Sequence, residues 1–176
     1  MKKTILLLFV LSFAFSFSGC EKDDICDANT ITTPRLVITF YYSDNASVEK
    51  NVTNLSIFGD EMEEAVSYNG STLINGSTVS IPLKVNTETT TFHFFLNYGS
   101  TNTAAPQNED ILKFNYSTQN IFVSRACGFK TNYTLDPTNP FEHTDAATPD
   151  QKWIKVVNVS NSIIANENET HLEIYF

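Results

Sequence analysis

Residues 91–98 read TFHFFLNY, and this stretch decides the fold class. Its apolar side chains Phe92, Phe94, Leu96 and Tyr98 recur at every second position. A period of two places them on one face of an extended strand, whereas a helix needs apolar residues three or four positions apart. Phe, Tyr and Thr are also residue types that strands favour. The stretch therefore predicts a β-strand with one face on a hydrophobic core.

The same alternation recurs on both sides of this strand. The segments that show it are 35–42, 79–85, 112–116, 129–135 and 172–176. In RLVITFYY, at 35–42, it places Leu36, Ile38, Phe40 and Tyr42 on one side. Helical periodicity is almost absent, and residues 59–66 would suit no more than a short helical turn. The chain is therefore predicted to be all-β.

Turn signals separate these segments. The Asn-Gly pairs at 69–70 and 75–76 each suit a type I′ hairpin turn. Pro82 has no N–H to donate, so its strand is expected at a sheet edge or at a bulge. Residues 136–151 contain three prolines and predict a long loop. Regularly spaced strands with such turns predict a single antiparallel β-sandwich of about eight or nine strands, immunoglobulin-like or Greek-key in type.

The first 19 residues predict a signal peptide. Lys2 and Lys3 precede an apolar run at 5–17, which fits the roughly 7–15 apolar residues of a secretory signal and falls short of the about 20 that span a bilayer. The run ends in FSFSGC, which resembles a bacterial lipobox with Phe17 where leucine is usual. This resemblance implies cleavage before Cys20, which becomes the new N-terminus, and alkylation of its thiol by diacylglycerol, whose acyl chains are palmitate or similar. The alternative is an ordinary signal peptide with an incidental cysteine.

The residues after Cys20 are charged. Lys22, Asp23 and Asp24 resemble the lipoprotein export signal of the Bacteroidota, which implies transfer to the cell surface. The alternative is a solvated linker, which charge runs usually are. We therefore expect three parts: a signal peptide at 1–19, a lipidated and acidic tether at 20–25, and a β-sandwich domain at 26–176. The expected location is the outer membrane, on the cell surface or otherwise on its periplasmic face.

The chain has three cysteines, and lipidation would use Cys20. Cys26 and Cys127 would then remain in an oxidising compartment, where a disulfide is the default. A zinc site would need further ligands at close spacing, and none accompanies these two residues. A catalytic role for Cys127 has no histidine nearby in sequence to support it. We therefore predict a Cys26–Cys127 disulfide.

Several segments together resemble a known family. TPRLVITFYY, IPLKVNTETTTFHF, VSRACGFKTNYTL and NENETHLEIYF are similar to small flavobacterial lipoproteins of unknown function. The most specific segment is SRACGFK, beside the lipobox-like start. The resemblance covers nearly the whole chain after Cys20. It implies an all-β lipoprotein of the cell envelope, and it implies no activity.

Charge limits the partners. The chain has 20 acidic and 11 basic residues, for a formal net charge of −9, and removal of Lys2 and Lys3 would make it more negative. Nucleic acid is a poor partner, because clustered Lys and Arg supply most of its affinity. Anionic lipid surfaces would repel so acidic a chain.

Three residues are weak candidates for binding: Trp153, Arg35 and Arg125. Trp153 is the single tryptophan; it could stack on a sugar if exposed, or pack in the core where a strand resumes. The two arginines flank predicted strands and could bind a carboxylate ligand. An ion pair with an acid such as Asp27 is the structural alternative.

No motif predicts an enzyme. The loop acids could gather calcium through hard oxygen ligands, although they lack the regular spacing of a calcium loop. They are Asp136, Glu142, Asp145 and Asp150, with Asn139. His93, His143 and His171 lie in separate segments. We expect no catalytic residue, metal or cofactor. Two functions stay open: a structural or protein-interaction module, with other outer-membrane proteins as possible partners, and a glycan-binding accessory of an uptake system.

Overall fold

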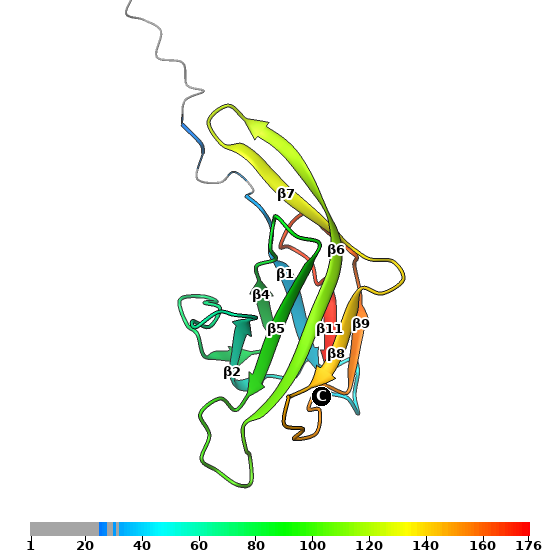
Figure 1. The fold of residues 1–176 in the computed structure, drawn as a ribbon. Helices are drawn as coiled ribbons and strands as arrows, with labels where there is room; N and C mark the ends of the chain where they lie inside the picture. The colour runs from blue at the N-terminus through cyan, green and yellow to red at the C-terminus, as the bar shows by residue number, and fades with distance from the viewer. Residues whose placement is uncertain (1–24, 28–29, 31) are drawn as a thin grey trace, which may run out of the picture. The chain divides into compact units, whose positions relative to one another are not determined.

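The computed structural model describes residues 25–27, 30 and 32–176. The described part of the chain is all-β, without a helix, and its strands form two sheets (Figure 1). Within that part no helix is long and apolar enough to cross a bilayer. The signal peptide predicted at 1–19 lies outside the described residues, as do Cys20, Lys22, Asp23 and Asp24.

The first sheet has four strands in the order β4-β1-β11-β9. Their bounds are β1 Leu36–Tyr41, β4 Thr78–Ile81, β9 Val156–Val159 and β11 Leu172–Tyr175. β1 pairs with β11 in parallel, with Ile38 opposite Leu172, so the expectation of a wholly antiparallel fold is wrong. The chain thereby joins its first strand to its last. β4 lies at the edge and ends at Ile81, directly before Pro82, as the missing N–H predicts.

The second sheet has seven strands, in the order β10-β7-β6-β5-β2-β3 with β8 paired to β6. Their bounds are β2 Val52–Gly59, β3 Ile74–Gly76, β5 Thr89–Leu96, β6 Asn108–Ser124, β7 Gly128–Leu135, β8 Phe141–Asp145 and β10 Ile163–Ile164. Figure 1 shows β5 beside β6, where Phe92 lies opposite Leu112. This register lays apolar residues of both strands on one face, because alternate residues of a strand face the same way.

One hydrophobic core contains side chains from both sheets. The four-stranded sheet contributes Leu36, Ile38 and Phe40 of β1, and the seven-stranded sheet contributes Phe92 and Phe94 of β5, among others. The alternation in TFHFFLNY is confirmed at these last two positions. Further along, Leu96 is half-buried and Tyr98 is exposed, because β5 ends and the chain turns at Asn97, whose φ is 55°.

β1 departs from the predicted alternation. All five residues at 36–40 are buried. Leu36, Ile38 and Phe40 face the core, and Val37 and Thr39 lie on the opposite face of the strand. The segment before β11 binds them: the Val37 amide donates to Nδ1 of His171 (3.0 Å), and the Thr39 and Thr170 hydroxyls lie 2.7 Å apart. The sequence of β1 does not reveal this second contact.

The strand count also differs, at eleven in the described residues instead of eight or nine. β3 and β10 have only three and two residues, too few for a pattern to reveal. β8 lies inside the predicted loop at 136–151, which is therefore shorter than expected. β8 fits because the prolines at 137, 140 and 149 lie outside it, so none removes an N–H from its ladder.

The predicted turns have mixed outcomes. Asn69 and Gly70 have φ of 50° and 78°, as a type I′ turn requires, and Tyr68 and Ser71 exchange hydrogen bonds across them. The turn predicted at 75–76 is wrong, since both residues lie in β3. The Asn75 side chain instead accepts from the Asn54 amide of β2 (2.9 Å). Residues 59–66 contain no helix: Gly59 ends β2, a turn and a bend follow, and Ala65 forms an isolated bridge with Phe58.

The chain divides into two compact units. One, called the hairpin unit here, combines Phe122–Phe129 with the N-terminal residues as far as Thr30. The other, called the main unit, consists of Ile31–Ile121 and Lys130–Phe176 and contains the whole hydrophobic core.

Candidate functional site

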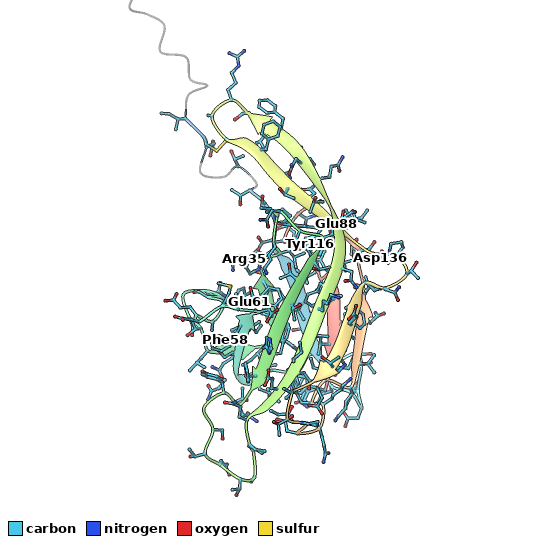
Figure 2. The ribbon with its side chains drawn as sticks, in the orientation of Figure 1. Arg35, Phe58, Glu61, Glu88, Tyr116 and Asp136 are labelled. Atoms are coloured by element: carbon cyan, nitrogen blue, oxygen red, sulfur yellow. A yellow bond between two sulfur atoms is a disulfide. The ribbon has the colours of Figure 1, made fainter. Side chains whose placement is uncertain are left out.

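The hairpin unit is closed by a disulfide. Cys26 and Cys127 are bonded, with their Cα atoms 4.8 Å apart, and the predicted pairing is confirmed. Figure 2 shows the sulfur–sulfur bond in yellow at the turn between β6 and β7. The bond fixes the N-terminal segment to a turn that lies 101 residues later in the chain.

Local contacts shape this turn. The Cys127 amide donates to Oγ of Ser124 (3.0 Å), and Gly128 has a φ of 70°, which glycine tolerates and other residues rarely adopt. The turn returns the chain so that Phe122 and Phe129 meet edge to face, with ring centroids 5.4 Å apart. The two phenylalanines are 57% and 70% exposed.

Sequence reasoning missed this exposed pair. It placed Phe129 with Tyr133 and Leu135 on a core-facing side, but only the latter two are buried. The available signal was two aromatic residues flanking a polar turn, in FVSRACGF. Arg125, a weak binding candidate, is exposed within the turn. Ile25, beside the bonded Cys26, is 84% exposed.

Arg35 precedes β1 in the main unit and is labelled in Figure 2. Its guanidinium donates to the carbonyls of Ser67 (3.1 Å) and Ser80 (3.5 Å), and its backbone amide donates to Oε1 of Glu167 (3.0 Å). Arg35 lines two hollows of about 390 and 320 Å³. Because these carbonyls bind Nη1, a carboxylate ligand would have to compete with them for Nη1 or use the other guanidinium donors. The ion pair with Asp27 stays a prediction.

Trp153 is not available for stacking on a sugar. It is only 7% exposed, and its Nε1 donates to the Phe94 carbonyl (3.1 Å). Its ring meets that of Phe176 edge to face at 5.2 Å. The contacts match the usual placement of tryptophan, with an apolar body in the core and its N–H satisfied. Of the two roles that the sequence left open for Trp153, the structure shows core packing.

Sequence reasoning did not identify an aromatic cluster on the face of β2 and β5 that points away from the hydrophobic core. It consists of Phe58, Phe95 and Tyr98, whose ring centroids are 5.5–5.7 Å apart, and is called the outer aromatic cluster below. Figure 2 labels Phe58 on β2. Phe58 and Phe95 are partly exposed and Tyr98 is 40% exposed. Phe95 falls between the core positions of TFHFFLNY, so the period-two reading set it aside.

Polar groups border the outer aromatic cluster. His93 stacks on Phe95 at 6.4 Å, its Nδ1 lies 2.5 Å from Oε1 of Glu109, and its Nε2 lies 3.7 Å from Oδ1 of Asp60. An apolar surface with a few oriented polar groups is the usual composition of a small-molecule site. The outer aromatic cluster is therefore a candidate binding surface.

The loop acids serve separate local purposes. Asp136 accepts from the amides of Thr138 and Asn139, which lowers its pKa, and Glu142 pairs with Lys113 at 3.1 Å. Asp150 has a raised pKa, first because of burial and also because Asp145 and Asp110 lie near. In the part of the chain that the structure describes, no group of three or more such side chains is arranged to hold a metal ion.

Asp110 is the most buried acid of this region, with no exposed surface. Its Oδ2 accepts from the Ile154 amide and bonds to Nε2 of His143, both at 2.9 Å. The contacts join β6, β8 and the segment before β9. Because one contact orients the Ile154 backbone and the other joins β6 to β8, we assign Asp110 and His143 a structural role.

The comparisons with known proteins give one result. Residues 54–176 match a family described as "Family of unknown function (DUF6452)". No curated protein and no solved structure matches the chain. The match covers most of the chain, including every strand from β3 to β11. The chain belongs to the DUF6452 family of unknown function.

Proposed function

We propose that this protein is a non-catalytic lipoprotein of the outer membrane, anchored through Cys20 and displayed on the cell surface, where it acts as a structural or protein-interaction module. The observation that carries the proposal is the Cys26–Cys127 disulfide, because disulfides persist in exported proteins and are rare in the cytosol. The lipobox-like FSFSGC and the acidic tag at 22–24 support it from the sequence. So does the resemblance to flavobacterial lipoproteins.

The proposed domain is a β-sandwich of immunoglobulin-like or Greek-key type. Its support is the single hydrophobic cluster that contains residues of both sheets. Aligned sandwiches build their cores in this way, from the inner faces of two sheets. The burial of Trp153 favours an interaction module over a sugar-binding site at that residue.

Metabolic labelling with a radioactive fatty acid tests the anchor. Wild-type protein is expected to carry label and Cys20→Ala to carry none. Cys26→Ala is the matched control, since it also loses one cysteine and should stay labelled. Label on Cys20→Ala would contradict the proposal.

Protease added to intact cells tests surface display. The variant with alanine at all three of residues 22–24 should still carry the label but be hidden from the protease. Unchanged digestion of this variant would contradict surface display.

A second candidate function is glycan binding, which the outer aromatic cluster favours. Aromatic faces beside carboxylates suit the apolar and hydroxyl surfaces of a sugar. Electrophoresis in gels containing starch, xylan or mannan should retard the wild type in one of them, and Tyr98→Ala should restore its mobility. Leu73→Ala, at another exposed apolar residue of the main unit, is the control. Equal mobility of the wild type in all three gels and in a plain gel would count against this candidate.

A further inference from the structure

We propose that the hairpin unit inserts Phe122 and Phe129 into the lipid bilayer, as a contact with the membrane that is separate from the acyl chains. The inference rests on the proposed anchoring at Cys20. It assigns a partner of stated chemistry, the bilayer surface, to the turn between β6 and β7.

The hairpin unit exposes large apolar side chains to solvent. Phe129, Phe122 and Ile25 are 70%, 57% and 84% exposed, and all three belong to the hairpin unit. Apolar side chains in water are unfavourable in proportion to their exposed area, and grouped ones mark interaction sites. The two phenylalanines contact each other and so form a patch, in contrast to single exposed residues.

Local contacts fix the geometry of this patch. The disulfide holds Cys26 to the turn, Ser124 Oγ accepts from the Cys127 amide, and Gly128 supplies the left-handed conformation. A patch fixed in this way loses little conformational freedom when it binds, which makes binding more favourable.

The tether between Cys20 and Cys26 is short. Six residue steps separate Cys20 from Cys26, and at 3.3–3.6 Å each they reach about 20 Å at most. Lipid on Cys20 would therefore keep Cys26, and the turn bonded to it, within reach of the bilayer surface at all times.

The turn segment of the hairpin unit carries no negative charge. Phe122–Phe129 contains Arg125 and no acidic residue, although acids outnumber bases 20 to 11 in the whole chain. The turn segment itself therefore adds no repulsion at an anionic surface, and the acidic residues of the hairpin unit, such as Asp27, belong to the N-terminal stretch bonded to it. An exposed arginine can hold its charge among the headgroups while aromatic neighbours enter the apolar layer.

A depth-sensitive fluorescence experiment tests the proposal on the full-length, lipidated protein. It is reconstituted into vesicles of phosphatidylcholine brominated near the carboxyl end of one acyl chain, because bromine quenches tryptophan at close range. Phe129→Trp is expected to lose most of its added emission relative to unbrominated vesicles. Trp153 is buried and supplies a constant background. Phe122→Trp is an independent second reporter, should the first variant fail to fold.

The control is Ile163→Trp, at a 55% exposed residue of the main unit, which should keep its emission. Flotation of the same vesicles separates the two proposals. Protein that floats with the vesicles while both hairpin tryptophans stay unquenched would overturn insertion and leave the lipid anchor intact. Protein that carries no acyl chain and does not float would overturn both. Quenching equal to that of Ile163→Trp would also overturn insertion.

Discussion

At the scale of single residues, His171 is a titratable side chain buried inside the protein. His171 has no exposed surface, and burial lowers its pKa, while Glu169 and Glu167 oppose that shift. Its Nδ1 accepts from the Val37 amide, so the ring is held in its neutral form. The Nε2 atom is buried, without a hydrogen-bond partner in the described part of the chain. Protonating this ring is therefore costlier in the folded state than in the unfolded one.

His171 predicts a pH dependence of stability. The unfolded chain takes up a proton near pH 6.5, and the folded chain resists it, so the free energy of unfolding should fall as pH drops below about 6.5. His171→Asn should flatten this slope, because asparagine can still accept from the Val37 amide but does not titrate. Urea denaturation of both proteins between about pH 7 and 5.5 measures the slopes. Parallel slopes would show that His171 does not cause the dependence.

At the scale of secondary-structure elements, a single strand combines core and surface functions. Phe129 and Tyr133 both belong to β7 and lie an even number of residues apart, so period two gives them the same face. Tyr133 is nonetheless buried, with its hydroxyl donating to the Leu83 carbonyl (3.1 Å), and burial raises its pKa to about 12. Phe129 belongs to the hairpin unit and is exposed. Sequence periodicity reports the face of a residue, but not whether a second layer covers it.

This difference in burial predicts that two matched substitutions in β7 lower the free energy of unfolding by very different amounts. Tyr133→Ala should lower the free energy of unfolding by about 3–5 kcal/mol, because it leaves a cavity and removes a buried hydrogen bond. Phe129→Ala should change it by less than about 0.5 kcal/mol, as exposed substitutions usually do. Urea denaturation at neutral pH compares them. Similar losses would mean that Phe129 is packed in solution.

Elements also show how far the sequence could predict the fold. The period-two pattern identifies β5, β7 and β11 because each has buried residues at alternate positions. It does not identify β3 or β10, which are too short to show a period. Nor does it reveal that β1 pairs with β11, because no local pattern encodes a partner so distant in the chain. At the candidate sites, cysteine count predicted the disulfide, whereas the outer aromatic cluster depends on the register of β2 with β5.

At the scale of the whole molecule, the strongest constraint on the chain is the disulfide. Cys26 and Cys127 close a loop with a sequence separation of 101. Chain-entropy estimates give about 4–5 kcal/mol of stabilisation for a loop of this length. The whole stability of a typical domain is only about 5–15 kcal/mol. The bond therefore contributes a large part of the resistance of the chain to unfolding.

Reduction is accordingly expected to lower the melting temperature substantially. Calorimetry with and without a thiol reductant measures the change. The variant with both Cys26→Ser and Cys127→Ser is the control, and it should melt at the lower temperature under both conditions. Thiol labelling of the denatured, unreduced protein supplies an independent check. Two reactive thiols at these positions would contradict the bond and the short tether that depends on it.

The parallel pairing of β1 with β11 has a consequence for biogenesis. β11 lies inside the four-stranded sheet, between β1 and β9, yet it follows both of these strands in the sequence. Until those residues emerge, one edge of β1 has no hydrogen-bonding partner, and such an edge invites aggregation. The pairing also joins residues far apart in the sequence, such as Ile38 and Leu172, and non-local contacts of this kind slow folding. A nascent chain with this topology therefore stays incompletely folded until β11 has been synthesised.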